Sequence, residues 1–321
     1  MKDIYEMLNL QLLAEPNTQT NGTGTLSDEM KTYYSDYLID NAVPKLVHDQ
    51  FGQKHPIPKN GGKTIEFRKY SPLPKLLTPL TEGVTPDGQS LTVTTIEATV
   101  DQYGGYVTIA DMLQLTAIDN NMVQATKLLG NQAGASLDTI TREVLNGGTN
   151  VIYAGGVASR SALTAEHKLT VDDIKKAVRA LKTQNAEKIG DSFVAIIHPD
   201  VTYDLTNDPT WQAVKDYDPK DWYEGEIGKI AGVRFVETTE AKIFEGGVYS
   251  TLILGDNAYG VTEIEGGGLE HIVKQLGSAG TADALNQRAS VGWKATKVAE
   301  RLVEQFMVRI ESKCTFNGAA N

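Results

Sequence analysis

Two stretches rich in Thr, Val, Ile and Phe decide the fold of this chain: Lys-Thr-Ile-Glu-Phe-Arg-Lys-Tyr at residues 63–70 and Leu-Thr-Val-Thr-Thr-Ile-Glu-Ala-Thr-Val at residues 91–100. Residues of these types in partial alternation are typical of β-strands. Residues 71–90, between them, hold four prolines and two glycines, too many for a continuous helix or a central strand. The pattern predicts a long two-stranded projection. Because such a ribbon is marginally stable alone, we expect it to rest on another surface.

The projection is also locally basic. Residues 54–75 hold six basic side chains and one acidic side chain, a net charge of +5, whereas the 321-residue chain carries −11. We predict that this segment lies on an acidic surface of a neighbouring copy, because complementary potentials set orientation and register. A solvated ribbon with incidental lysines is the alternative. The predicted inter-subunit contact residues are Lys54, Lys59, Lys63, Arg68, Lys69, Lys75 and Glu82.

After the projection, the pattern predicts helices that alternate with strands. Apolar residues at helical spacing predict a helix of about 27 residues, roughly 40 Å long, from an N-cap at Asp119 to Gly147. Gly130 and Gly134 inside it cost roughly 1 kcal/mol each relative to Ala, so either another backbone approaches closely or the helix breaks there. A second helix is predicted to begin at Thr170, whose hydroxyl can cap it.

The remaining periodic segments predict strands, a short helix from Val201 and an N-terminal helix from Ser27 that follows an extended arm at residues 14–26. Residues 290–310 are expected to form one or two long strands of a terminal sheet, and residues around Cys314 are expected to fray. The other predicted strands are residues 192–197, 230–236, 248–254, 259–264 and 269–275.

Composition disfavours several classes of protein. A net charge of −11 argues against a protein that neutralises a nucleic-acid backbone over a broad surface. One cysteine cannot form an intrachain disulfide, so no oxidising compartment is needed. We also expect neither a secretion signal nor a membrane span, since no uninterrupted apolar run has the required length.

Motifs for catalysis fail on spacing or context. Residues 60–64 (Asn-Gly-Gly-Lys-Thr) end like a phosphate-binding loop, but Ile57 occupies the position of the first glycine and a strand pattern follows, so we interpret them as a turn. The five histidines are scattered, and no serine lies in a Gly-x-Ser-x-Gly motif. We therefore predict no catalytic, cofactor or metal site and no enzyme activity. An α/β enzyme whose catalytic residues converge from distant segments is the alternative.

Several runs of the sequence resemble one family. The order of flexible arm, long projection, long helix, α/β portion and terminal sheet resembles the Hong Kong 97-like fold of tailed-phage capsid proteins. The amino-acid sequence itself resembles the major capsid family typified by the head protein of coliphage N-four. The runs that carry this resemblance are Pro-Lys-Leu-Val-His-Asp-Gln-Phe-Gly at 44–52, Gly-Lys-Thr-Ile-Glu-Phe-Arg-Lys-Tyr at 62–70, Leu-Thr-Glu-Gly-Val-Thr-Pro at 80–86 and Gln-Tyr-Gly-Gly-Tyr-Val at 102–107.

The resemblance implies an α+β capsid subunit that forms hexamers and pentamers of an icosahedral phage head. It also implies that the head encloses double-stranded DNA without sequence-specific binding, with a portal and scaffolding or decoration proteins as partners. Assembly is expected in the host cytoplasm, with no cofactor. An encapsulin-like shell that holds protein cargo is the alternative. The implied divisions are an N-terminal arm and first helix at 1–52, an extended loop at 53–105, a spine helix and peripheral domain at 106–189, an axial domain at 190–268 and a return to the peripheral domain with a C-terminal tail at 269–321.

Overall fold

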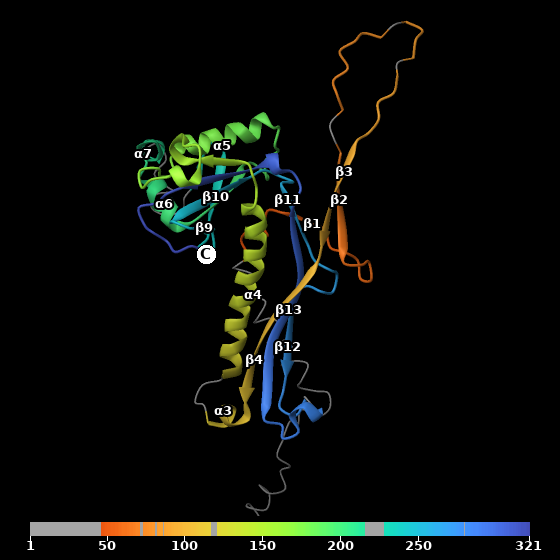
Figure 1. The fold of residues 1–321 in the computed structure, drawn as a ribbon, viewed down its shortest axis with the longest axis vertical. Helices are drawn as coiled ribbons and strands as arrows, with labels where there is room; N and C mark the ends of the chain where they lie inside the picture. The colour runs from red at the N-terminus through yellow and green to blue at the C-terminus, as the bar shows by residue number, and fades with distance from the viewer. Residues whose placement is uncertain are drawn as a thin grey trace, which may run out of the picture.

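The protein is elongated and is built along one long helix (Figure 1). This computed structural model describes residues 46–70, 73–80, 82–85, 87–116, 121–215, 228–278 and 280–321. The arm expected at residues 14–26 and the helix expected from Ser27 lie outside the described residues. The predicted N-cap Asp119 lies outside them as well.

The long helix, α4 (Asn121–Asn146), packs against a five-stranded sheet. Its apolar stripe, including Leu129, Ala133 and Leu137, meets Val291 and Trp293 of the central strand. Gly130 and Gly134 are buried inside an uninterrupted helix, so the alternative of a break there is wrong. The sheet contains β1 (Gln53–Lys54), β11 (Tyr259–Thr262), β13 (Arg288–Arg301) and β12 (Glu270–Lys274) in that order, and β4 (Asp101–Ala110) also pairs with β13. The short helix α3 (Asp111–Thr116) follows β4.

The other half of the protein is a seven-stranded sheet. Three helices cover this sheet: α5 (Val171–Thr183), α6 (Pro199–Thr206) and α7 (Pro209–Lys215). The predicted cap is confirmed, because the Thr170 side chain accepts a hydrogen bond from the Asp173 backbone N–H at 3.3 Å. The strand order is β5 (Val151–Tyr153), β14 (Met307–Ser312), β10 (Val248–Leu254), β6 (Phe193–Ile197), β8 (Val233–Glu237) and β7 (Lys229–Ile230), with β9 (Ile243–Phe244) on β10. Short 3-10 helices span Ala154–Gly156, Arg160–Ala162, Gly280–Asp283 and Glu304–Phe306.

Two strand predictions need correction. Residues 230–236 form two antiparallel strands, β7 and β8, because Ala231 and Gly232 adopt positive φ angles of 53° and 82° and turn the chain. Residues 290–310 do not build a terminal sheet of their own. They contribute β13 to the five-stranded sheet and β14 to the seven-stranded sheet, so this segment links the two halves of the protein.

The expectation of a frayed C-terminus is wrong. Thr315 donates from its backbone N–H and its hydroxyl to the Asp204 carboxylate at 2.7 and 2.5 Å. The Cys314 thiol is buried and contacts the Asp200 carbonyl at 3.1 Å. Burial raises the pKa of this thiol to about 12. The tail is therefore fixed to α6 by a carboxylate that lies 111 residues away in the sequence.

Candidate functional site

The predicted projection is present as a hairpin of β2 (Thr64–Tyr70) and β3 (Val93–Thr99) that extends away from the body of the protein (Figure 1). The two strands pair antiparallel from Thr64 opposite Thr99 to Tyr70 opposite Val93. The described residues between them, which we call the tip (73–80, 82–85 and 87–92), contain no helix or strand. The two strand predictions are thus confirmed.

Only the base of the hairpin is packed. Ala98 is buried, and a Cβ atom added to Gly260 of β11 would lie 3.0 Å from the Phe67 ring. The Val100 N–H also donates to the Lys63 carbonyl at 2.8 Å. The hairpin base is therefore held against the five-stranded sheet while the tip is not.

A buried polar cluster fixes the segment that leads into the hairpin, residues 46–57, which we call the strap. His48 donates from its backbone N–H to Asp138 of α4 at 2.7 Å, and its ring Nδ1 lies 2.6 Å from the second carboxylate oxygen. Lys297 of β13 pairs with Asp49, and burial lowers the pKa of this lysine. The Tyr259 hydroxyl donates to the His48 carbonyl. The strap is thus joined to both the helix and the sheet that carry the hairpin.

The outer part of the hairpin exposes large apolar side chains. Leu77, for example, is 85% exposed. Monomeric proteins rarely leave contiguous apolar patches of this kind in water, and such patches mark interaction sites. Sequence reasoning does not single these residues out. The available signal is that leucines recur in a segment too rich in proline to build a core. The exposed apolar residues of the hairpin are Tyr70, Leu73, Leu76, Leu77, Leu80, Val84, Leu91 and Val93.

All seven predicted contact residues are exposed, but they do not gather on one face. Arg68 pairs with Glu66 at 3.3 Å, and both side chains are in contact with solvent. Lys69 follows Arg68 on β2 and so points to the opposite side of the strand. The structure distributes the seven over the base (Lys54, Lys59), the strands (Lys63, Arg68, Lys69) and the tip (Lys75, Glu82).

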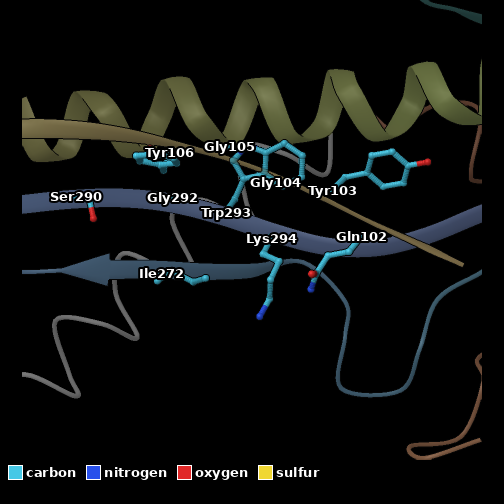
Figure 2. A pocket seen from close by; sticks show the side chains of 10 residues that line it. All are labelled: Gln102, Tyr103, Gly104, Gly105, Tyr106, Ile272, Ser290, Gly292, Trp293 and Lys294. Carbon is cyan, nitrogen blue, oxygen red and sulfur yellow. The ribbon is translucent and has the colours of Figure 1, made fainter. Parts of the chain in front are cut away.

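A shallow groove of about 420 Å³ runs along β4, β13 and β12 (Figure 2). Gly104 and Gly292 leave part of it without side chains, while Tyr106 is 76% exposed beside them. A Cβ atom on Gly292 would lie 2.9 Å from both the Gly105 carbonyl oxygen and the Tyr106 Cβ, so glycine is needed for these strands to approach. Lys294 at the groove pairs with Glu270 at 3.0 Å. The lining of the groove thus combines backbone, aromatic and polar groups.

Residues 60–64, whose sequence ends like a phosphate-binding loop, begin with a turn. Asn60 and Gly62 have φ angles of 68° and 92°, and the Gly61 N–H donates to the Pro58 carbonyl at 2.9 Å. The strand β2 follows, which confirms the interpretation as a turn. Among the described residues, no group of three or more His, Cys, Asp or Glu side chains is placed to hold a metal ion. In this same part of the chain, no helix has the length and apolar character to cross a bilayer.

In a comparison with known protein families, the model described as phage capsid protein matches residues 93–302. That segment covers β3, α4 and the strands of both sheets from β4 to β13, and leaves out β1 and β14. The chain belongs to the phage capsid protein family. This capsid protein is therefore a major structural component of a phage head, located in the virion, and it is not an enzyme.

Solved structures support the fold of the capsid protein. The capsid of cyanophage P-SCSP1u matches with 15% identity and a TM-score of 0.66 over 84% of this chain and 89% of the other. The capsid asymmetric unit of cyanophage Pam1 matches with 14% identity and a TM-score of 0.66 over 88% and 93%. The capsid of Ralstonia phage GP4 matches with 14% identity and a TM-score of 0.64 over 85% and 89%. No curated protein matches the chain in sequence. The mixed α+β, Hong Kong 97-like fold is thus confirmed.

Proposed function

We propose that the protein assembles as hexamers and pentamers into an icosahedral head that encloses double-stranded DNA. The observation that carries this proposal is the hairpin, whose apolar tip and basic strands are left in solvent by a single copy. A neighbouring copy that accepts the hairpin would cover this surface. Each copy would make several contacts with its neighbours, and each contact would bury a modest area of protein surface. Repeated contacts of this kind are suited to a closed symmetric shell.

The charge of the protein supports enclosure of DNA without tight binding. The net charge of −11 disfavours tight binding of phosphates over a broad surface, so a genome packed inside could be released. A portal protein and scaffolding or decoration proteins are the further partners in this proposal. Nucleic acid recovered from nuclease-treated shells supports a phage head, whereas protein cargo without DNA supports the encapsulin-like alternative.

We further propose that the protein belongs to the branch typified by coliphage N-four, because the runs at residues 62–70 and 80–86 resemble that branch. We also propose that the chain divides into an arm, an extended loop, a spine helix, a peripheral domain and an axial domain. The loop at 53–105 contains the whole hairpin. Three elements of the segments assigned to the peripheral domain, α5, β5 and β14, pack in the seven-stranded sheet or its core together with β6, β8 and β10 of the proposed axial segment.

The basic strands of the hairpin provide the test. Replacing Lys63, Arg68 and Lys69 together by Glu reverses three exposed charges without touching the core. Single exposed ion pairs are worth about 0.2–1 kcal/mol, but the loss recurs at every contact in a shell. We expect shell yield, measured by electron microscopy and sedimentation, to fall at least tenfold, with the circular dichroism of the free subunit unchanged.

A matched control reverses the same number of charges elsewhere. Lys175, Arg179 and Lys182 lie on the exposed face of α5, so their replacement by Glu makes the same change in net charge. The control variant should assemble like the unmodified protein. Equal shell yields for the two triple variants would refute the role of the basic hairpin.

A further inference from the structure

The helix α5 lies over the seven-stranded sheet (Figure 1) and exposes a row of cations on its outer face. Ile174 and Leu181 on the opposite face are fully buried, which fixes the orientation of the helix. Successive residues of an α-helix are about 100° apart, so Lys175, Arg179 and Lys182 fall within about 60° of one another around the axis. They span about 10 Å along it. We call these three exposed residues the α5 row.

Acidic side chains beside the α5 row are already paired. The two acids of the helix, Asp172 and Asp173, both pair with Lys176, whose ammonium lies 2.8 and 3.2 Å from their carboxylates. Within the part of the chain that the structure describes, no carboxylate pairs with a member of the row. The row is therefore a local positive surface on a protein of net charge −11.

The side chains around the α5 row distinguish a polyanion from a protein surface as its partner. Protein–protein contacts are built around apolar and aromatic side chains and are depleted in Lys. The exposed side chains of α5 are all charged or polar, whereas the hairpin combines its cations with exposed leucines. The row continues into Thr183, Gln184 and Asn185, all exposed, and hydroxyl and amide side chains are common phosphate contacts. The row therefore suits phosphates better than the core of a protein interface.

We propose that the α5 row contacts phosphates of the double-stranded DNA that the shell encloses. This inference rests on the proposed function and adds the surface through which the protein touches the genome. One DNA strand carries a phosphate about every 3.4 Å of helix axis, so a row about 10 Å long matches about three consecutive phosphates. Three such contacts bind weakly and without regard to base sequence, which is compatible with release of the genome.

Binding of a duplex of about 20 base pairs to free subunits tests the row. Joint replacement of Lys175, Arg179 and Lys182 by Gln removes three charges without touching the buried face of α5. Each phosphate contact adds about 0.9 to the slope of log association constant against log salt concentration, so the slope should become about 2.7 less steep. Between about 50 and 200 mM NaCl, these contacts account for an about 40-fold loss of affinity. Fluorescence anisotropy of a labelled duplex measures both quantities.

A matched control removes the same types of charge from three different elements. Lys127 of α4, Arg234 of β8 and Lys274 of β12 are all exposed. Their joint replacement by Gln should change the slope by less than the value of one contact, about 0.9. Equal changes of slope for the two triple variants would show that binding follows net charge alone, and would overturn the inference.

Labelling of assembled shells separates DNA from a neighbouring copy as the partner. A small amine-acetylating reagent marks Lys175 and Lys182, and mass spectrometry reads the extent of reaction. Both lysines should react at least threefold more slowly in DNA-filled shells than in shells assembled without DNA. Equal reactivity in the two kinds of shell would contradict the inference, and equally slow reaction in both, relative to free subunits, would assign the row to a contact between copies instead.

Failure of this inference can be told apart from failure of the proposed function. Absence of shells from the unmodified protein would refute the proposed function and the inference with it. Normal shells combined with an unchanged salt slope for the α5 variant would refute the inference alone.

Discussion

Asp138→Ala should weaken the attachment of the strap to α4. The Asp138 carboxylate is fully buried and accepts two hydrogen bonds from His48, at 2.7 and 2.6 Å. Its removal leaves two buried nitrogen atoms of His48 without a partner. Each of these unsatisfied buried groups costs about 1–3 kcal/mol. We therefore expect the free energy of unfolding to fall by about 2–5 kcal/mol.

This loss should be visible in two measurements on unassembled subunits. At about 2–4 °C per kcal/mol, the denaturation midpoint should fall by about 4–20 °C. Hydrogen exchange should also lose protection at residues 46–51 before it loses protection in the seven-stranded sheet. Asp172→Asn, at an exposed carboxylate of α5, is the control and should change neither quantity. A destabilisation below about 1 kcal/mol with full protection of the strap would show that the buried pair does not hold it.

Two further substitutions test the tail and the strand pair. Burial raises the pKa of Asp204, but hydrogen bonds from Thr315 and Cys314 outweigh it and leave the pKa below its usual value. The Asp204 carboxylate therefore stabilises the fold above its unfolded pKa of about 3.9, and this stabilisation is lost as pH falls through the folded pKa. Asp204→Asn should lower the free energy of unfolding by about 1–3 kcal/mol at pH 7, and by progressively less below about pH 4. Urea denaturation at a series of pH values measures this difference. A difference that is constant with pH would contradict this. Gly292→Ala should cost about 1–3 kcal/mol by overpacking against Gly105 and Tyr106, whereas Gly88→Ala, with open space around it, should cost almost nothing in the same assay.

Local patterns predict the elements whose stability is local. The apolar stripe of α4, the Thr170 cap of α5 and the alternation in β2 and β3 can all be recognised within a few neighbouring residues. The strand β4 is different, since Gly104 and Gly105 weaken its pattern and its ten residues are stabilised by pairing with β13, almost 200 positions away. Long-range pairing of this kind leaves no local signal.

The same distinction applies to the candidate site. The excess of basic residues in the hairpin is visible in the sequence, but their distribution over two faces of β2 depends on strand geometry. The apolar hairpin tip becomes recognisable as a surface only when exposure is known, because leucines are usually buried. The fixed C-terminus depends on Asp204, which local sequence around Thr315 cannot reveal.

Electron microscopy of the purified, unmodified protein is the most direct test of the central claim. The account predicts closed shells of hexamers and pentamers in which the hairpin of each copy, residues 64–99, lies over a neighbouring copy. A monodisperse small oligomer under all assembly conditions, or shells in which the hairpin tip stays in solvent, would contradict it.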